Sequence, residues 1–380
     1  MAERLQDTIA LLDTLIGFDT TSHKSNLDCI AYIEDYLKKL GAHTHRLANA
    51  ENTKASLFAT LGDAKGGVVL SGHTDVVPVE GQAWEQDAFT LTDKGDGKLY
   101  GRGTCDMKGF IACALAMAPH FKQTGKTVHF AFSYDEEVGC LSAPELADHL
   151  KETGANPSLV VVGEPTSMDV VDSHKSIHSF ITRIRGQEGH SSDPAAGVNA
   201  VAVGAELVLE LQRLAKAQQA EDRLNTRFLP PYSTIHVGVL KGGTARNIIP
   251  NACEMAWEIR GLPEADVDGI VAEFNSICAQ KTSEMQVTAA HTGIETQALS
   301  RVPGLLAEPD NPAVAQCLHA CGHNHTRAVS FATEAGIFQT RGFPTLICGP
   351  GSIAQAHKAN EFVEKSQLAS CLDFLQKIVD

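Results

Sequence analysis

Four short apolar runs, each followed closely by an acidic or imidazole side chain, constrain the fold of this 380-residue chain more than any other feature. The runs are GGVVLSG before His73, VHFAFS before Glu136, LVVVG before Glu164 and TLICG ahead of His357. Short apolar runs next to glycine are typical of buried strands, and helical stretches between them favour a parallel sheet. In open parallel sheets, ligands bind just past the carboxyl ends of the strands. The sequence therefore predicts an α/β domain with a mostly parallel sheet and a site at one edge of it.

A change of pattern at Ile177 predicts a second, inserted domain. The segment reads as strand, helix, strand, strand, helix and strand at residues 177–186, 197–217, 233–243, 252–261, 265–281 and 285–291. This βαββαβ order is that of the ferredoxin-like sandwich, a compact α+β unit. Helices of the flanking α/β pattern are expected at 110–121, 142–151, 312–321 and 364–379. We therefore expect a discontinuous larger domain of residues 1–176 and 292–380, interrupted by a domain of residues 177–291.

Composition argues against several classes of function. The formal net charge of −15 disfavours a nucleic-acid partner, because phosphate binding needs a basic surface. The longest apolar run, residues 111–118, is far shorter than a membrane span, so no membrane partner is expected. The start, MAERLQDTIALLDTLIGF, carries acids and no small-residue cleavage site, and is not expected to be a signal peptide. Ten cysteines without a visible pairing pattern are typical of reduced thiols, which predicts a cytoplasmic protein.

The residue types near the strand ends indicate a metal site. Imidazole nitrogens and carboxylate oxygens together suit zinc, cobalt or manganese, and the lack of thiolates argues against a closed structural zinc site. The candidate ligands are His73, Asp106, the Glu136–Glu137 pair, Glu164 and His357. Two histidines and three carboxylates are enough for two ions if one carboxylate bridges them. Asp106 is the natural bridge, because it lies between two glycine-rich turns in GTCDMKG.

Further acidic groups are expected to support this site. Asp75 lies two residues after His73, where its carboxylate could hold that imidazole in the ligating tautomer. Glu136 and Glu137 are direct neighbours and cannot easily do the same job. One of them can ligate while the other stays free as a general base that takes a proton from water.

Each candidate also has an ordinary structural interpretation. A His or Asp after a strand is usually a turn or a helix cap, and a Glu-Glu pair is usually a solvated helix start. The coincidence of all the candidates near strand ends favours the functional interpretation. A rival tract, CLHACGHNHT, holds Cys317, His319, Cys321, His323 and His325. We interpret it as a helix end with buried thiols and surface histidines, because Gly322 is expected to end the helix.

The chain resembles the di-zinc exopeptidases and deacylases in six motifs: GHTDVVP, GTCDMKG, DEEVG, GEPT, the GH of GQEGH, and AHKANE. The resemblance covers essentially the whole chain, the inserted segment included. It implies two zinc (or cobalt) ions per chain, with Glu136 as the base. By this likeness, the two ions would be held by His73, Asp106 and Glu164, and by Asp106, Glu137 and His357.

The same resemblance assigns a role to the inserted domain. It implies a dimerisation and lid domain, so that a homodimer is expected. His190, in GQEGH, would reach into the partner's site and steady the oxyanion. The peptide bond after the bridging Asp106 is typically cis in this family, although a cis bond before a residue other than proline is rare. The residues expected to serve catalysis are therefore Glu136, Asp75 and His190.

Two stretches, FATEAGIFQ and CGPGSIAQAHKANEFV, resemble the branch of the family that removes the acetyl group from N-acetylornithine, a step of arginine biosynthesis. The partner would be a small acyl amino acid with an α-carboxylate, an acetyl amide and a terminal ammonium. Arg260 and Asn247 match family positions that grip the carboxylate, and Glu334 is the candidate for the ammonium. Their ordinary interpretations are a strand-end arginine, a turn asparagine, and a helix-start acid or a contact of a metal-site neighbour.

Other functions stay open at this point. A desuccinylase, a dipeptidase or another acyl-amino-acid amidohydrolase of the same family would carry the same metal ligands. A non-catalytic binding protein on this fold is a further alternative. The complete ligand set and the intact Glu136 argue against it, because a protein that has lost catalysis usually lacks one of them.

Overall fold

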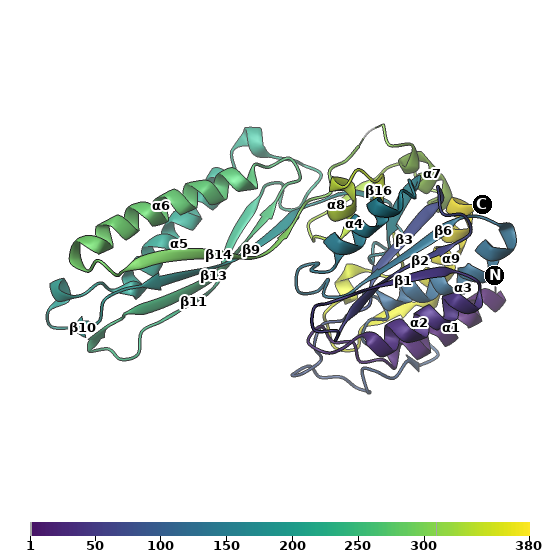
Figure 1. Ribbon diagram of the computed structural model, residues 1–380, viewed down its shortest axis with the longest axis horizontal. Coiled ribbons are helices and arrows are strands. Elements are labelled where there is room, and N and C mark those ends of the chain that lie inside the picture. Colours follow the sequence, from purple (N-terminus) through teal and green to yellow (C-terminus); the bar gives the residue numbers. More distant parts are fainter. Residues whose placement is uncertain (1, 309) are drawn as a thin grey trace. The chain divides into compact units, whose positions relative to one another are not determined.

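The computed structural model describes residues 2–308 and 310–380, and these form two compact units (Figure 1). The first unit comprises the residues up to Ser173 together with Leu305–Ala328 and Thr333–Asp380. The second unit comprises His174–Gly304 and Val329–Ala332. The chain therefore leaves the first unit after Ser173, returns at Leu305 and contributes once more to the second unit at Val329–Ala332.

An eight-stranded mixed sheet forms the centre of the first unit and confirms the predicted fold class. Its strands are β1 (His43–Ala48), β2 (Ala55–Leu61), β3 (Val68–His73), β6 (Val128–Ser133), β7 (Leu159–Val162), β8 (Val171–His174), β15 (Arg327–Val329) and β16 (Thr345–Ile347). They lie in the order β1-β2-β6-β3-β7-β16-β8-β15. The four central strands β6, β3, β7 and β16 are parallel, whereas β1, β2 and β8 pair antiparallel toward the edges. The parallel centre is buried, as expected for near-continuous apolar strands.

Helices cover both faces of this sheet (Figure 1). The helices of the first unit are α1 (Ala2–Ile16), α2 (Leu27–Lys39), α3 (Lys108–Thr124), α4 (Ala143–Thr153), α7 (Pro312–Cys321), α8 (Ala335–Thr340) and α9 (Lys365–Val379). The apolar faces of α1, α2, α7 and α9 join α3 in one buried cluster over the sheet. Helices α4 and α8 contact each other and the other face. Among the described residues, no helix is both long and apolar enough to cross a membrane.

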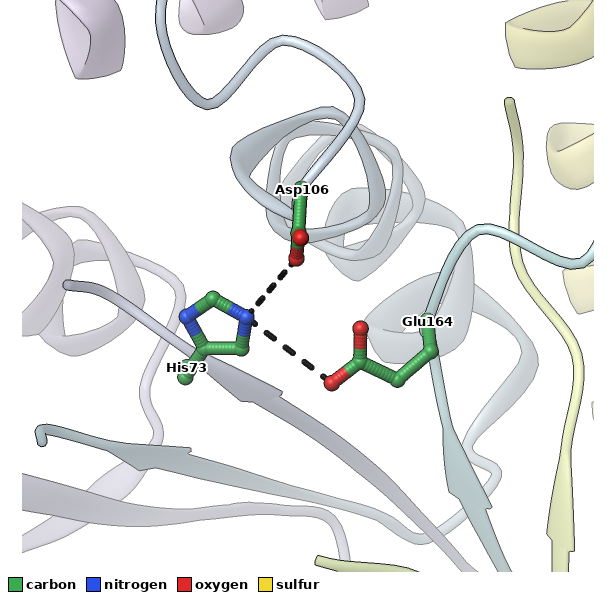
Figure 2. Close-up of side chains that lie close together, drawn as sticks. All are labelled: His73, Asp106 and Glu164. Atoms are coloured by element: carbon green, nitrogen blue, oxygen red, sulfur yellow. Dashed lines mark hydrogen bonds and ion pairs between the residues drawn. The ribbon is translucent and has the colours of Figure 1, made fainter. Parts of the chain in front are cut away.

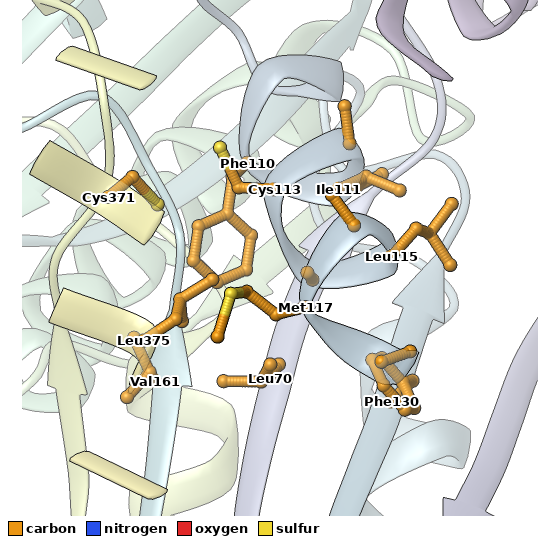
Figure 3. Packing of buried hydrophobic residues seen from close by; sticks show 14 of the residues in the cluster. Leu70, Phe110, Ile111, Cys113, Leu115, Met117, Phe130, Val161, Cys371 and Leu375 are labelled. Carbon is orange, nitrogen blue, oxygen red and sulfur yellow. The ribbon is translucent and has the colours of Figure 1, made fainter. Parts of the chain in front are cut away.

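Helix α3 lies at the centre of the core, where it packs beside α9 and over the sheet (Figure 3). It is apolar on nearly all sides, which is typical of a helix buried all round. Its Phe110 packs so closely over Gly163 that a Cβ atom at Gly163 would overlap the aromatic ring. Gly125, with φ of +67°, ends the helix in the left-handed conformation that favours glycine. The core thereby fixes α3, at whose amino end Asp106 lies, against the strand that precedes Glu164.

The second unit is a ferredoxin-like sandwich, as predicted. Its elements in chain order are β9 (Ser176–Arg185), α5 (Ala200–Ala217), β11 (Thr234–Gly242), β13 (Ala252–Gly261), α6 (Val267–Thr288) and β14 (Gly293–Val302). The strands form an antiparallel sheet in the order β11-β13-β9-β14. One face of the sheet packs against α5 and α6, where Trp257 stacks on Phe180 and meets Phe274 edge-on.

The predicted last strand of the inserted domain, residues 285–291, is wrong. Residues 285–288 continue helix α6, and the strand is β14, which follows. Buried Phe274, Cys278 and Met285 continue the helical period, whereas Val287 is exposed. The predicted end of the domain at residue 291 therefore falls short of β14, and the second unit runs to Gly304.

Short elements complete the chain. A three-stranded sheet joins β17 (Phe362–Glu364), β5 (Lys98–Tyr100) and β4 (Thr92–Asp93). A two-stranded sheet in the second unit joins β10 (Gly189–His190) to β12 (Ile248–Ile249). Single 3₁₀ turns occupy Pro194–Ala196, Glu221–Arg223 and Ile353–Gln355.

Candidate metal centre

The structure brings the predicted ligands together at one edge of the first unit's sheet. His73 is the last residue of β3, and the Glu136–Glu137 pair follows β6. Glu164 follows β7, and His357 lies on the loop after β16. These four strands are neighbours and run parallel, so their carboxyl ends meet at the same edge. Asp106 joins them from the loop just before α3.

His73, Asp106 and Glu164 form a fully buried group, which we call the buried triad (Figure 2). His73 Nε2 lies 3.0 Å from Asp106 Oδ1 and 3.8 Å from Glu164 Oε1. Burial alone would lower the pKa of His73, but the hydrogen-bonded carboxylates of Asp106 and Asp75 raise it well above its usual value. The imidazole therefore faces strong negative potential on the side of Nε2.

Asp106, Glu137 and His357 form a second group, the open triad. His357 Nε2 lies 2.9 Å from Glu137 Oε2 and 3.4 Å from Asp106 Oδ2. The His357 side chain is 55% exposed, in contrast to His73. Asp106 thus turns one oxygen to each histidine, as a bridging carboxylate would. The peptide bond between Asp106 and Met107 is cis, as the family resemblance implies.

The donors of the two triads fit two divalent cations. The ligand atoms of each triad all lie within 4.8 Å of one another. Glu164 Oε1 is buried and makes no hydrogen bond, which is costly for a carboxylate unless a cation neutralises it. Burial, with the charge of Asp106, raises the pKa of Glu164 well above its usual value and that of Glu137 to about 7. Nitrogen and carboxylate donors without thiolate suit zinc or cobalt.

Glu136 lies beside the triads without belonging to either of them. Glu136 is half-buried, and the loss of solvation raises its pKa well above the usual value. Cys140 Sγ donates to Glu136 Oε1 at 3.4 Å. A carboxyl group with a raised pKa is suited to accept and return a proton near neutral pH.

Asp75 lies against both His73 and the glutamate pair. The nearest acceptor to His73 Nδ1 is the backbone carbonyl of Asp75 at 2.9 Å, whereas the Asp75 carboxylate lies 3.5 Å away. That carboxylate accepts the backbone N–H groups of Glu136 and Glu137 and the hydroxyl of Ser22. Both the carbonyl and the carboxylate of Asp75 therefore face His73 Nδ1, and the carboxylate also holds the turn that carries the glutamate pair.

Glu334 is buried at the start of α8 in the first unit. The hydroxyl of Ser71, two residues before His73 on β3, donates to Glu334 Oε2 at 3.4 Å, while Oε1 makes no hydrogen bond. Burial raises the pKa of Glu334 to about 7. The side chain forms no helix cap, so the interpretation as a simple helix-start acid does not describe it.

His190, Asn247 and Arg260 belong to the second unit, so their predicted roles stay predictions. His190 is exposed on β10, and its Nδ1 lies 2.7 Å from the hydroxyl of Ser192. Asn247 lies in the adjacent turn, where its carbonyl accepts the N–H of Ser191. Arg260, on β13, is paired with Glu258 at 3.0 Å.

Sequence reasoning missed a buried ion pair behind the open triad. Arg102 donates to Glu361 at 2.6 Å, and both side chains are enclosed. Glu361 lies within the AHKANE motif, four residues after His357, so the motif contained it. Its role depends on backbone N–H groups far away in sequence, for which no residue pattern exists.

The rival tract forms the end of α7, as predicted. Gly322 ends the helix with φ of +70°, and Cys317 is buried, whereas Cys321 is half-buried. His319, His323 and His325 are exposed. Neither group of potential metal ligands within the described residues includes the tract.

Comparison with known proteins agrees with the resemblance that the motifs indicate. A family model described as "Peptidase family M20/M25/M40" matches residues 69–380. The chain is 35% identical over 374 residues to acetylornithine deacetylase of Proteus mirabilis, with 95% of this chain and 92% of that protein covered. It is 33% identical over 393 residues to acetylornithine deacetylase of Myxococcus xanthus, with 100% and 98% covered.

Solved structures share the fold. The aminopeptidase PepT of Bacillus cereus superimposes with a TM-score of 0.74 at 18% identity, covering 99% of this chain and 98% of that one. The M20 family metallo-carboxypeptidase Sso-CP2 of Sulfolobus solfataricus gives 0.75 at 15% identity, covering 98% of each chain. At these identities the likeness concerns the fold alone.

Proposed function

Because the chain belongs to peptidase family M20/M25/M40, a family of hydrolases, we propose that it removes the acetyl group from N2-acetyl-L-ornithine. The products would be L-ornithine and acetate, as in arginine biosynthesis. The observation that carries the proposal is the pair of triads that share Asp106, with Glu136 beside them. The acetylornithine deacetylases among its relatives support the choice of substrate.

The proposed reaction is hydrolysis of a linear amide. Two divalent ions held by the triads would supply Lewis-acid polarisation of the acetyl carbonyl and an activated water. Glu136 takes one proton from the water while the water oxygen forms a bond to the acetyl carbon. It then gives this proton to the ornithine nitrogen as the amide C–N bond breaks. The raised pKa of the half-buried Glu136 favours this proton transfer near neutral pH.

Three further side chains are proposed to recognise the substrate. Glu334 would pair with the terminal ammonium, for which its buried and incompletely bonded carboxylate is suited. Arg260 and Asn247 would hold the α-carboxylate, with Arg260 exchanging its contact to Glu258 for the substrate. Relatives that take uncharged side chains would have less use for a carboxylate at position 334.

The second unit and the thiols suggest the biological setting. We propose that the chain forms a homodimer through the second unit and that His190 steadies the oxyanion in the partner's site. All ten cysteines are free, as expected for a cytoplasmic protein. A mixed dimer of His190→Ala and Glu136→Ala chains should regain activity in one of its two sites. Failure to regain it would contradict the shared site.

The first experiment measures amine release from N-acetyl-L-ornithine by zinc- or cobalt-loaded protein, beside metal-stripped protein. Rapid metal-dependent release supports the proposal. Two bound ions per chain without release would retain the hydrolase assignment and direct the search to N-succinyl amino acids and dipeptides. The absence of both amine release and bound metal would refute the metal centre itself.

The Glu334→Gln variant tests the choice of substrate. Loss of the carboxylate should raise KM for N-acetyl-L-ornithine by about tenfold or more, because a charged hydrogen bond contributes about 1.5–3 kcal/mol. The KM for N-acetyl-L-methionine, which has no ammonium, should change little. Equal changes for both substrates would remove the ammonium role.

A further inference from the structure

We infer that Glu361, Arg102 and Gln82 act as a positioning clamp that holds the loops of Asp106 and His357 at the spacing two metal ions require. The inference rests on the proposed metal centre. None of the three side chains is a candidate ligand. All three belong to the first unit, and together they connect the backbone of the bridging residue to the backbone of the exposed histidine.

Glu361 fixes the loop that carries Asp106. Its Oε1 accepts the backbone N–H groups of Cys105 at 2.8 Å and of Asp106 itself at 3.0 Å. Its Oε2 accepts the N–H of Gly103 at 3.1 Å and Arg102 Nη1 at 2.6 Å. Pairing of β17 with β5 brings Glu361 opposite this loop. A carboxylate with both oxygens satisfied in this way holds the loop from three points.

Arg102 connects Glu361 to Gln82 through hydrogen bonds to both side chains. It is enclosed, like Glu361, and a buried ion pair is expensive to desolvate. Its Nη2 donates to Gln82 Oε1 at 2.7 Å, and the indole of Trp84 donates to the same oxygen at 3.0 Å. Two donors on one amide oxygen fix the orientation of the Gln82 side chain. Its NH₂ group must then point the other way.

Gln82 uses that NH₂ group to hold His357. Gln82 Nε2 donates to the backbone carbonyl of His357 at 3.1 Å. His357 has a φ of +62°, a left-handed conformation that is unfavourable for a residue with a Cβ and persists only when neighbours fix it. Asn360, with φ of +56°, is fixed in the same loop by the N–H of Glu85. The exposed ligand therefore depends on an anchor outside its own loop.

The geometry gives the members of the clamp separable effects. Glu361 acts on Asp106, which both triads share, so removal of the Glu361 carboxylate should lower the affinity for both ions. Gln82 acts on His357, which belongs to the open triad alone, so its loss should weaken one ion. A general loss of stability would not separate the two ions in this way.

The test measures zinc affinity and stoichiometry by competition with a chelator, and the absorption of bound cobalt, in full-length protein. Glu361→Gln places an NH₂ group against backbone donors and should weaken both ions about 10–100-fold, the usual effect of losing a group that orients ligands. Gln82→Ala should weaken one ion about tenfold and leave the other unchanged. Glu364→Gln, an exposed carboxylate on β17, is the matched control and should bind like the parent.

A double-variant series identifies which ion is affected. In a His357→Ala background, Gln82→Ala should have no further effect on the remaining ion, whereas Glu361→Gln should still weaken it. Parental affinity in Glu361→Gln, or equal weakening of both ions in Gln82→Ala, would overturn the clamp. If Glu361→Gln does not fold, the Gln82 series decides alone. A parent chain that binds no metal overturns the metal centre as well, whereas two ions bound without acetylornithine hydrolysis overturns only the substrate.

Discussion

The buried and open triads have the same kinds of ligand but different surroundings. Each combines one histidine, one glutamate and the shared Asp106. The His73 side chain is 1% exposed and ends a central strand, whereas the His357 side chain is 55% exposed and lies on a loop in a left-handed conformation. Rigid strand ends lock one half of the site, and loop contacts hold the other. The comparison teaches that the two ions should differ in affinity and exchange rate although their ligands match.

Asp106→Asn should have the largest effect, because Asp106 is the one ligand that belongs to both triads. An amide carries no charge to bridge two cations, so both triads lose their common ligand. We expect both ions to be lost and turnover to fall by about a thousandfold or more, since metal ions contribute several kcal/mol to such reactions. Metal content per chain and kcat measure the outcome. Retention of two ions would show that Asp106 is not the bridge.

Glu136→Gln should separate catalysis from metal binding in both triads. We expect kcat to fall about 10²–10⁴-fold, the usual contribution of a general base, with both ions retained. Metal analysis and steady-state kinetics on the same preparation measure this. Glu51→Gln, an exposed carboxylate in the same unit, is a control of equal chemistry. Substantial activity in Glu136→Gln would assign the base elsewhere.

A pair of histidine variants tests the asymmetry directly. His357→Ala should lower the affinity for one ion by more than about a hundredfold, because even groups that only orient ligands contribute about 10–100-fold. That ion should therefore be released. The other ion should remain. His73→Ala should also lower the thermal stability of the metal-free fold, since it opens a cavity beneath the sheet edge. Similar melting temperatures for the two metal-free variants would contradict the distinction.

The smallest effect concerns protons. In the metal-free protein, hydrogen bonds to Asp106 and Glu137 raise the pKa of His357 to about 10, so the imidazole carries a proton near pH 8. Metal must displace it, and apparent affinity should therefore rise with pH up to about 10. Calorimetry in two buffers of different ionisation enthalpy measures the released proton. His357→Ala should release fewer protons, and unchanged release would point to another group.

The same raised pKa of His357 determines how the stability of the metal-free fold changes with pH. A pKa raised above its unfolded value, about 6.5 for histidine, contributes stability that is complete below that value. This contribution is lost as pH rises through about 10. The melting temperature of the metal-free protein should therefore decrease over this interval while metal affinity increases.

Much of the fold and of the ligand cluster was predictable because both follow local rules. Short apolar runs define the parallel strands, and polar residues just beyond them must share an edge. Residues that depend on tertiary contact were not predictable. Glu361 binds a backbone N–H group 255 residues away in sequence, and the orientation of Gln82 depends on Arg102 and Trp84. Strand β14 has exposed polar residues and no apolar alternation, so no sequence pattern predicts it. The end of α6 is predicted as the last strand instead.

The order of ligands along the chain has a consequence for biosynthesis. The buried triad is complete once Glu164 has left the ribosome, but the open triad must wait for His357, after the second unit has emerged. Roughly two hundred residues separate these events, or about 10–40 s at ordinary translation rates. The loop of Asp106, however, is held by Glu361, which leaves the ribosome after His357, so both triads gain this support only near the end of synthesis. High-affinity loading of either ion is therefore expected only once the chain is nearly complete.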